Sequence, residues 1–345
     1  MKRVQTGESL VLAGTEWVQL RYRHILEDTV EVRMEDFSGI TNPVFQESMF
    51  AGVKRQTFVV GRDYELDAVN GRIRRLPHSR IRDFSESVFY GKAVFNHEGL
   101  HGKWGNYPFM VYVSYIYEDT NNRLVEDEAR GITAKLGTRR LSASIDRLLR
   151  GEELTYLVFG DSISVGCEAL YRGETYFARL VDHLQRVTGG SVNLCNESIG
   201  GQTSRNGVER LPAILERHRP HLISIAYGVN DMCRGGGHKD VTVEEYTDNM
   251  RRMVQMAKAS GAEVILITNC LPNPHWKFTG ADHKDYAVAL RRLAAEEDVA
   301  LADVQALWER ELLHGKKLSD LLLNDVNHPS SYGHYLYAAM LDTLV

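Results

Sequence analysis

Four short polar segments in the second half of the chain carry residue types that together could perform acyl transfer. In chain order they are 160–162 (GDS), 196–203 (NESIGGQT), 228–231 (GVND) and 325–328 (DVNH). A serine hydroxyl is a poor nucleophile at its own pKa, so Ser162 would need a base within hydrogen-bonding reach. His328 can be that base, and Asp325 can hold the other ring nitrogen and stabilise the imidazolium. The spacing therefore predicts a Ser162, Asp325, His328 catalytic triad.

The remaining two segments could supply the donors that a tetrahedral intermediate requires. The backbone N–H of Ser162, the backbone N–H of Gly201 and the side-chain amide of Asn230 could converge on the developing oxyanion. A glycine at 201 lets the backbone approach closely without a Cβ atom in the way. Removal of one such donor typically costs about 2.7–4 kcal/mol of transition-state stabilisation.

Each segment by itself also has an ordinary structural interpretation. Ser162 follows the apolar run 154–159 (LTYLVF) directly, as a helix N-cap at a strand-to-helix turn would. We expect Asp161 to cap the next helix, and Asp231 to hold its own loop through side-chain-to-backbone bonds. The G-x-S-x-G elbow of α/β-hydrolases is excluded, because Ser164 stands where its second glycine would be. Only the joint occurrence of the four segments favours catalysis.

The elements that would position these residues alternate between strand and helix from residue 154 onward. Short apolar runs predict strands at 154–159, 191–196, 221–228, 262–269 and 299–303. Helices are expected at about 174–187, 204–218, 242–260, 282–297, 303–314 and 331–344. This alternation is typical of βαβ units that form a parallel sheet with helices on both faces. Ligands of such folds bind beyond the carboxyl ends of the strands, where the four polar segments lie.

The first 137 residues follow a different pattern of short strands and turns. Alternating or clustered β-branched and aromatic residues, with a hairpin signal at Asn70-Gly71, predict an all-β sandwich or jelly-roll-like domain. Residues 85–108, rich in glycine and aromatic residues, are expected to form an ordered loop. Apolar residues at helical spacing predict a linking helix over 138–153. We therefore expect a β-sandwich domain over 1–137 and a catalytic domain over 154–345.

The four segments of the second domain resemble the SGNH, or GDSL, hydrolase family. The four marker residues of that family map in order onto Ser162, Gly201, Asn230 and His328, and its catalytic aspartate maps onto Asp325. The resemblance covers 154–345, with GDSIS in place of GDSL. It implies a flavodoxin-like, three-layer α/β/α domain and serine esterase chemistry that uses no metal and no cofactor.

Composition and charge limit the binding partners and the cellular compartment that we expect for this protein. The formal net charge is −5; residues 1–150 hold 22 Lys and Arg against 20 Asp and Glu, and residues 151–345 hold 19 against 26. The acidic second half argues against a nucleic-acid partner. No apolar run is long enough for a signal-peptide core or a membrane span, and the four cysteines form no C-x-x-C pair. These features predict a cytoplasmic protein with reduced cysteines and no membrane partner.

The substrate is inferred from the order of the two domains. A β-domain ahead of an SGNH domain is similar to some carbohydrate esterases, which implies deacetylation of sugars such as acetylated xylo-oligosaccharides. We expect a small-molecule or oligosaccharide ester as partner, and a homo-oligomer is possible. His275 and Trp276 could line an acyl or sugar pocket, or two prolines could merely shape a rigid loop on which Trp276 packs.

Two other functions compete with this interpretation. A lipase or thioesterase for longer acyl chains is disfavoured because no strongly apolar, lid-like helix flanks the expected site. A non-catalytic carbohydrate-binding protein is disfavoured by the intact Ser162, Asp325 and His328.

Overall fold

A five-stranded parallel sheet forms the centre of the second half of the chain. The computed structural model describes residues 1–36, 54–98, 100, 105–119, 123–235 and 240–345. The strands of this sheet are β8 (Leu154–Gly160), β9 (Val192–Asn196), β10 (Leu222–Ala226), β11 (Glu263–Ile267) and β12 (Ala300–Ala302). Their spatial order is β9-β8-β10-β11-β12, and all neighbours run parallel. This is the flavodoxin-like order, so the predicted fold of the second domain is confirmed.

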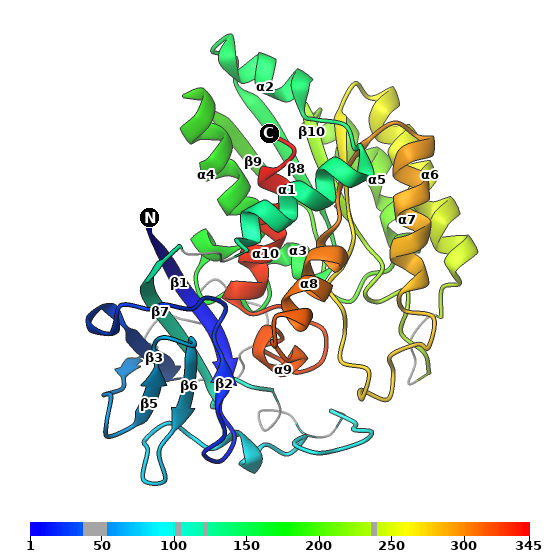
Figure 1. Ribbon diagram of the computed structural model, residues 1–345. Helices are drawn as coiled ribbons and strands as arrows, with labels where there is room; N and C mark the ends of the chain where they lie inside the picture. The colour runs from blue at the N-terminus through cyan, green and yellow to red at the C-terminus, as the bar shows by residue number, and fades with distance from the viewer. Residues whose placement is uncertain (37–53, 99, 101–104, 120–122, 236–239) are drawn as a thin grey trace.

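Helices cover both faces of the parallel sheet, giving three layers (Figure 1). One layer contains α4 (Tyr176–Thr188), α8 (Val304–Leu313) and α10 (Ser331–Asp342), and α10 contacts both of the others. The opposite layer contains α5 (Ser204–His218), α6 (Val243–Ala259) and α7 (Asp285–Glu296), packed in that order. The expected βαβ alternation over 154–345 is therefore present.

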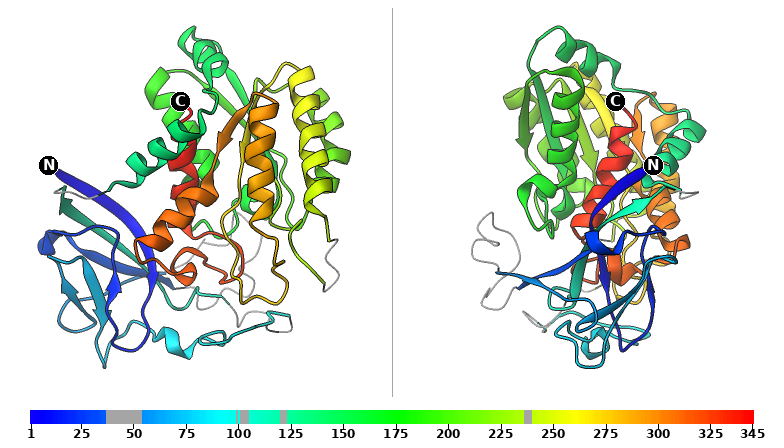
Figure 2. Two further views of the ribbon diagram at one scale, coloured as in Figure 1. Left: turned by 45° about the vertical axis from the view of Figure 1, so that its right-hand side comes forward. Right: turned by 60° about the vertical axis from the view of Figure 1, so that its left-hand side comes forward.

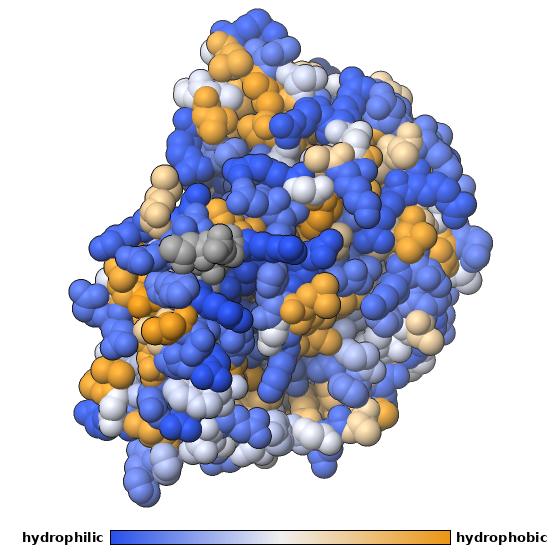
Figure 3. Space-filling model, in the orientation of Figure 1, coloured by the Kyte–Doolittle hydropathy of each residue, from blue (hydrophilic) through white to orange (hydrophobic). Residues whose placement is uncertain are grey.

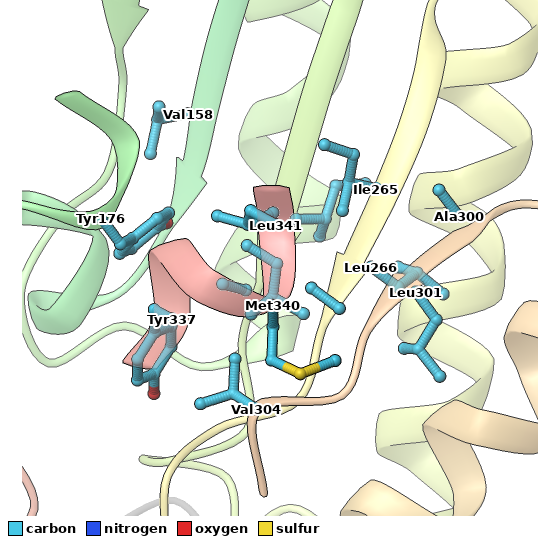
Figure 4. Packing of buried hydrophobic residues seen from close by; sticks show 14 of the residues in the cluster. Val158, Tyr176, Ile265, Leu266, Ala300, Leu301, Val304, Tyr337, Met340 and Leu341 are labelled. Atoms are coloured by element: carbon cyan, nitrogen blue, oxygen red, sulfur yellow. The ribbon is translucent and has the colours of Figure 1, made fainter. Parts of the chain in front are cut away.

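The core of this region is apolar on both faces of the sheet. Strands β8 and β10 are buried along almost their whole length, as parallel strands covered on two sides must be. Figure 4 shows Met340 and Leu341 of α10 in the same buried cluster as Ile265 and Leu266 of β11, whose side chains point to opposite faces of the sheet. Helix α10 is buried nearly all round, because helices α4 and α8 and the sheet surround it.

The first part of the chain forms two antiparallel sheets. One has the order β1 (Lys2–Val11), β7 (Met110–Glu118), β3 (Glu31–Asp36), β4 (Lys54–Thr57), and the other has the order β2 (Val18–Gln19), β6 (Arg72–Arg75), β5 (Tyr64–Asp67). Leu10, Val113, Val18 and Ile73 come from both sheets and share one core, which confirms the β-sandwich. At the hairpin between β5 and β6, a Cβ at Gly71 would lie 2.0 Å from the Tyr22 carbonyl oxygen, so only glycine fits.

The structure differs from the expected pattern between β7 and the linking helix. Residues expected to continue the β-rich region instead form α1 (Val125–Leu136), which contacts α8 and α10. Val125 and Ala129 belong to the core of the parallel-sheet region. Acidic residues in the first turn and a left-handed Gly137 after the last turn are ordinary helix-end signals. The linking helix follows as α2 (Ser142–Leu149).

A polar seam joins the two regions. We use this name for the contacts of β1 and the residue 21 side chain with residues 311–330, which include α9 (Leu318–Leu321). Lys316 Nζ lies 2.5 Å from Glu8 Oε1, and Arg21 Nε lies 2.8 Å from Glu311 Oε1, with all four side chains buried. The Ser9 and Ser330 hydroxyls share a hydrogen bond of 2.8 Å. Both views in Figure 2 place the N-terminal strands, in blue, below the helical layers.

The surface of the molecule is mainly hydrophilic on the face shown in Figure 3, where apolar side chains form small, separate patches. Among the described residues, no helix combines the length and the apolar character needed to cross a lipid bilayer.

Candidate active site

Ser162 lies at the carboxyl end of strand β8, next to the central strand β10. It is the first residue of α3 (Ser162–Val165), whose N-cap is Asp161: one carboxylate oxygen accepts a hydrogen bond of 3.0 Å from the Ile163 N–H. The turn is tight, because a Cβ at Gly160 would lie 2.5 Å from the Ala226 carbonyl oxygen. The Ser162 hydroxyl oxygen lies 2.8 Å from Nε2 of His328. The structure thus brings the expected nucleophile and base into hydrogen-bonding contact.

His328 lies in the loop between α9 and α10, which is held chiefly by the side chain of Asn324. The Asn324 side-chain oxygen accepts hydrogen bonds of 2.9 Å from three successive backbone N–H groups, those of Val326, Asn327 and His328. The His328 carbonyl accepts a further bond of 3.0 Å from the Leu323 N–H. The ring is therefore presented from a turn that the Asn324 side chain and one backbone bond hold in place.

The carboxylate that contacts His328 is that of Glu168. Its Oε1 lies 3.2 Å from Nδ1 of His328, on the opposite side of the ring from Ser162. Asp325, the expected partner, instead accepts hydrogen bonds at Oδ1 from the side-chain amides of Asn106, at 3.3 Å, and Asn273, at 3.5 Å. Burial raises the pKa of Asp325 to about 6, against the opposing effect of these two amides.

Sequence reasoning did not find Glu168. It lies in the loop that follows α3, is 3% exposed, and adopts a left-handed backbone conformation with φ of 68°. Its second carboxylate oxygen accepts a hydrogen bond from the Tyr107 hydroxyl, which belongs to the N-terminal region. One signal in the sequence was available, since Glu168 is the lone charged residue in the stretch 166–171 (GCEALY).

The two loops expected to complete the oxyanion hole lie against each other. The Asn230 side-chain amide donates a hydrogen bond of 2.9 Å to the carbonyl of Gln202, the residue after Gly201. The Ser162 N–H is at the start of a helix, where an amide has no acceptor within the helix. Gly201 has φ of 74°, and no heavy atom lies within 4 Å of the position of a Cβ. Within the protein, the need for glycine at this position comes from its left-handed backbone; close approach of this backbone to a bound oxyanion stays a prediction.

The two aspartates beside the site have capping roles. Asp161 caps α3 as expected, and burial raises its pKa to about 8. Asp231 accepts hydrogen bonds from the backbone N–H of Ser204 at 3.0 Å and from the Ser204 hydroxyl. It therefore holds the start of α5 and not only its own loop. Burial raises the pKa of Asp231 to about 6.

His275 and Trp276 lie where a segment of the N-terminal region crosses the loop after β11. Trp276 is 4% exposed and packs in an aromatic cluster that includes Phe89, Phe95 and Phe278. Its indole N–H donates a hydrogen bond of 2.9 Å to the His97 ring. His275 is exposed, and its Nδ1 lies 2.9 Å from the Ala93 carbonyl oxygen.

The crossing segment is the first part of the loop expected over residues 85–108. Backbone bonds link Phe95 to both His275 and Lys277, at 2.8 and 3.0 Å. Figure 1 shows this segment, in cyan, running along the lower edge of the molecule. The described part of the loop is ordered against the second region, while residues 99 and 101–104 lie outside the described residues.

Comparison with known proteins places this site in a family context. Residues 158–336, just over half of the chain, match the model of the GDSL-like lipase/acylhydrolase family. An arylesterase from Vibrio mimicus is 35% identical over 121 residues, which cover 35% of this chain but 57% of that protein, less than two thirds of its length. An acetylxylan esterase from Geobacillus stearothermophilus is 28% identical over 204 residues, 54% of this chain and 91% of that protein.

A solved structure shares the fold. A two-domain esterase active on acetylated mannans superposes with a TM-score of 0.50 at 19% identity, over 60% of this chain and 54% of that one. At this identity the likeness shows the fold alone.

Proposed function

The chain belongs to the GDSL-like lipase and acylhydrolase family, and we propose that it is a serine esterase that removes acetyl groups from carbohydrates such as acetylated xylo-oligosaccharides. The observation that carries the esterase proposal is the 2.8 Å contact between the Ser162 hydroxyl and Nε2 of His328, at the carboxyl end of β8. This is the edge at which parallel α/β sheets bind their ligands.

The proposed reaction proceeds through an acyl-enzyme. Ser162 Oγ attacks the ester carbonyl carbon while its proton passes to Nε2 of His328. The carbonyl oxygen becomes an oxyanion, which the N–H groups of Ser162 and Gly201 and the Asn230 amide stabilise. His328 then returns the proton to the leaving alcohol. Water, deprotonated by His328, attacks the acyl-enzyme and releases the acid and free Ser162.

The substrate proposal rests on a relative and on the surroundings of the site. The matching acetylxylan esterase is covered over 91% of its length, so the resemblance includes most of that protein. The aromatic cluster around Trp276 is closely packed, which leaves the exposed His275 as the residue that we assign to contact a sugar at the rim. For the N-terminal region we propose a role in packing and assembly.

A substrate panel tests the proposed specificity. The purified protein would be assayed on p-nitrophenyl esters from acetate to octanoate and on acetylated xylo-oligosaccharides. We expect the highest kcat/KM on acetate and release of acetate from the sugars. A preference for octanoate would instead indicate a lipase or thioesterase. Binding of the sugars with no turnover of any ester would indicate a non-catalytic carbohydrate-binding protein.

Two serines of the same short helix provide a matched test of the nucleophile. Ser162→Ala should lower kcat by on the order of 10⁴-fold or more, because the acyl-enzyme can no longer form. Ser164→Ala is the control, since the Ser164 hydroxyl bonds to Tyr176 at 2.8 Å and not to His328. If Ser162→Ala kept more than a few per cent of the activity of Ser164→Ala, the assignment of the nucleophile would be wrong.

A further inference from the structure

We infer that Glu168 is the positioning residue that orients His328, and that Tyr107 of the N-terminal region fixes Glu168 for this task. The inference deepens the proposed function and rests on it, since the orientation of the ring matters for turnover only if His328 is the base. It also gives the N-terminal region a role in the reaction, because Tyr107 precedes β7 and lies outside the parallel-sheet region.

The hydrogen bonds on the two sides of the ring define the protonation that catalysis requires. For Nε2 to accept the Ser162 proton, the ring proton must be on Nδ1. A carboxylate is an acceptor without a proton to donate, so Glu168 at 3.2 Å from Nδ1 favours this tautomer. After proton transfer the same carboxylate faces an imidazolium, whose positive charge it stabilises.

Glu168 is tied to the helix that carries the nucleophile. The N–H of Cys167 donates a hydrogen bond of 3.1 Å to the Ser162 carbonyl, and the N–H of Ala169 donates one of 3.3 Å to the Gly166 carbonyl. These bonds flank Glu168, which adopts a left-handed backbone conformation. The nucleophile and the proposed positioning carboxylate therefore belong to one short, internally bonded loop.

Tyr107 fixes the second oxygen of Glu168. Its hydroxyl donates to Oε2, which leaves Oε1 for the ring, and its side chain is buried. The preceding residue, Asn106, donates from its backbone N–H to the Leu323 carbonyl at 2.7 Å and from its side chain to the Leu322 carbonyl at 2.9 Å. The dipeptide 106–107 thus contacts both the loop of His328 and the carboxylate that faces its ring.

Asp325 is less suited to the same task in this geometry. Its carboxylate accepts from two asparagine amides, one of them that of Asn106. Burial raises the pKa of Asp325 to about 6, so a substantial fraction is protonated in weakly acidic solution, and a neutral carboxyl stabilises an imidazolium poorly.

Paired substitutions of the two carboxylates test the inference. Glu168→Gln should lower kcat by about 10³-fold with little change in KM, because its amide can donate to Nδ1 and favour the wrong tautomer. The competing variant is Asp325→Asn, which should lower kcat less than Glu168→Gln does, since an amide oxygen still accepts from the asparagines. Both variants would be assayed on p-nitrophenyl acetate, with thermal unfolding as the check of folding.

Two further variants of Glu168 separate orientation of the ring from packing. If Glu168 only filled space, the nearly isosteric Glu168→Gln would be milder than Glu168→Ala. The positioning role predicts that Glu168→Gln is at least as damaging in kcat as Glu168→Ala. It also predicts that Glu168→Asp, which keeps the carboxylate, recovers at least tenfold over Glu168→Gln.

Tyr107→Phe extends the test to the N-terminal region and serves if the Glu168 variants do not fold. It should lower kcat by about tenfold at unchanged KM, because Oε2 loses its donor and the carboxylate can turn from the ring. Wild-type kcat in Tyr107→Phe, a milder effect of Glu168→Gln than of Glu168→Ala, or a larger loss in Asp325→Asn than in Glu168→Gln would each overturn the inference. Those results would leave the Ser162 test untouched, whereas an active Ser162→Ala would contradict the proposed function itself.

Discussion

The core of the parallel sheet and the polar seam hold their parts of the molecule together by different means. In the core, side chains such as Leu266 and Met340 make apolar contacts, which have no directional requirement. Many other apolar side chains of similar volume would fit at these positions. Across the seam, Glu8 meets Lys316 and Arg21 meets Glu311, all four buried. Buried charges tolerate one arrangement only, because each must face its partner.

This difference shows which contacts fix the positions of the layers and which fix the positions of the residues next to the site. Apolar packing is sufficient to form the three layers and to bring Ser162 to the end of β8. The seam sets how the N-terminal region docks, and with it the positions of Asn106 and Tyr107 next to the site. We therefore expect damage to the core to reduce stability alone, and damage to the seam to reduce stability and turnover together.

The largest effect is expected from Lys316→Met in the seam. The Lys316 side chain is 1% exposed, and its removal leaves Glu8 buried without its cation. The free energy of unfolding should fall by about 3–5 kcal/mol, as when one partner of a buried ion pair is deleted. Chemical denaturation would measure this loss, and kcat on p-nitrophenyl acetate should fall with it.

The control for this prediction removes both charges. In the double variant Glu8→Gln, Lys316→Met no charge is left unpaired, so its stability should exceed that of the single variant. Equal stability of the two variants would show that the pair does not behave as a matched buried contact.

The next largest effect is expected in the core. Leu266→Ala should lower the free energy of unfolding by about 3 kcal/mol, because it leaves a cavity in the buried core beside Leu301 (Figure 4). The kcat of the folded variant should stay at the wild-type value. Leu149→Ala is the matched control, since Leu149 is 62% exposed, and it should change stability by less than about 0.5 kcal/mol. Loss of kcat in folded Leu266→Ala would contradict the distinction between core and seam.

A smaller effect is expected in the pH dependence of stability at Asp325. Burial raises the pKa of this carboxyl from 3.8 to about 6 in the folded protein. Between about pH 4 and pH 6 the folded state therefore binds the proton more strongly than the unfolded state, so stability falls as the pH rises through this window. Asp325→Asn lacks this titration, and its stability relative to the wild type should rise by about 2 kcal/mol from pH 4 to pH 7.

Urea denaturation of both proteins at several pH values would measure this difference. A constant difference across the range would mean that the pKa of Asp325 is not raised in the folded protein.

The smallest effect is expected where the N-terminal region crosses the loop after β11. Trp276→Phe keeps an aromatic ring but removes the N–H that donates to His97. Stability should fall by about 1 kcal/mol, the usual value of one hydrogen bond. Thermal unfolding would measure it, and a loss above about 3 kcal/mol would show that the tryptophan itself, through packing, holds the crossing segment in place.

The sequence allowed the parallel-sheet region to be predicted well because its signals are local. Each strand is a short apolar run. Ser162 follows the run 154–159 directly, and His328 ends the short segment DVNH, so both can be recognised from a few neighbouring residues. The helix α1 was missed, although its end signals are local too, because the strand pattern before it was extended through residue 137. The domain boundaries and the roles of the site residues remain predictions.

Glu168 could not be predicted because its position depends on conformation and on distant contacts. A left-handed backbone at a glutamate is not favoured by its residue type, so nothing local indicates it. Its partner Tyr107 lies 61 positions earlier in another region. The contact of Asp231 with the start of α5 could not be predicted either, because its partner Ser204 lies 27 positions away in the chain.

The bond between the Ser9 and Ser330 hydroxyls has a consequence for the growing chain, since these residues are 321 positions apart. At the usual rate of synthesis, roughly 15–60 s separate their emergence from the ribosome. During that interval β1 can pair with β7, but Glu8 must wait for Lys316. The surface of β1 that the seam later covers is therefore exposed to water or to a chaperone until residues 316–330 have emerged. Activity should accordingly appear only after residues 316–330 have docked.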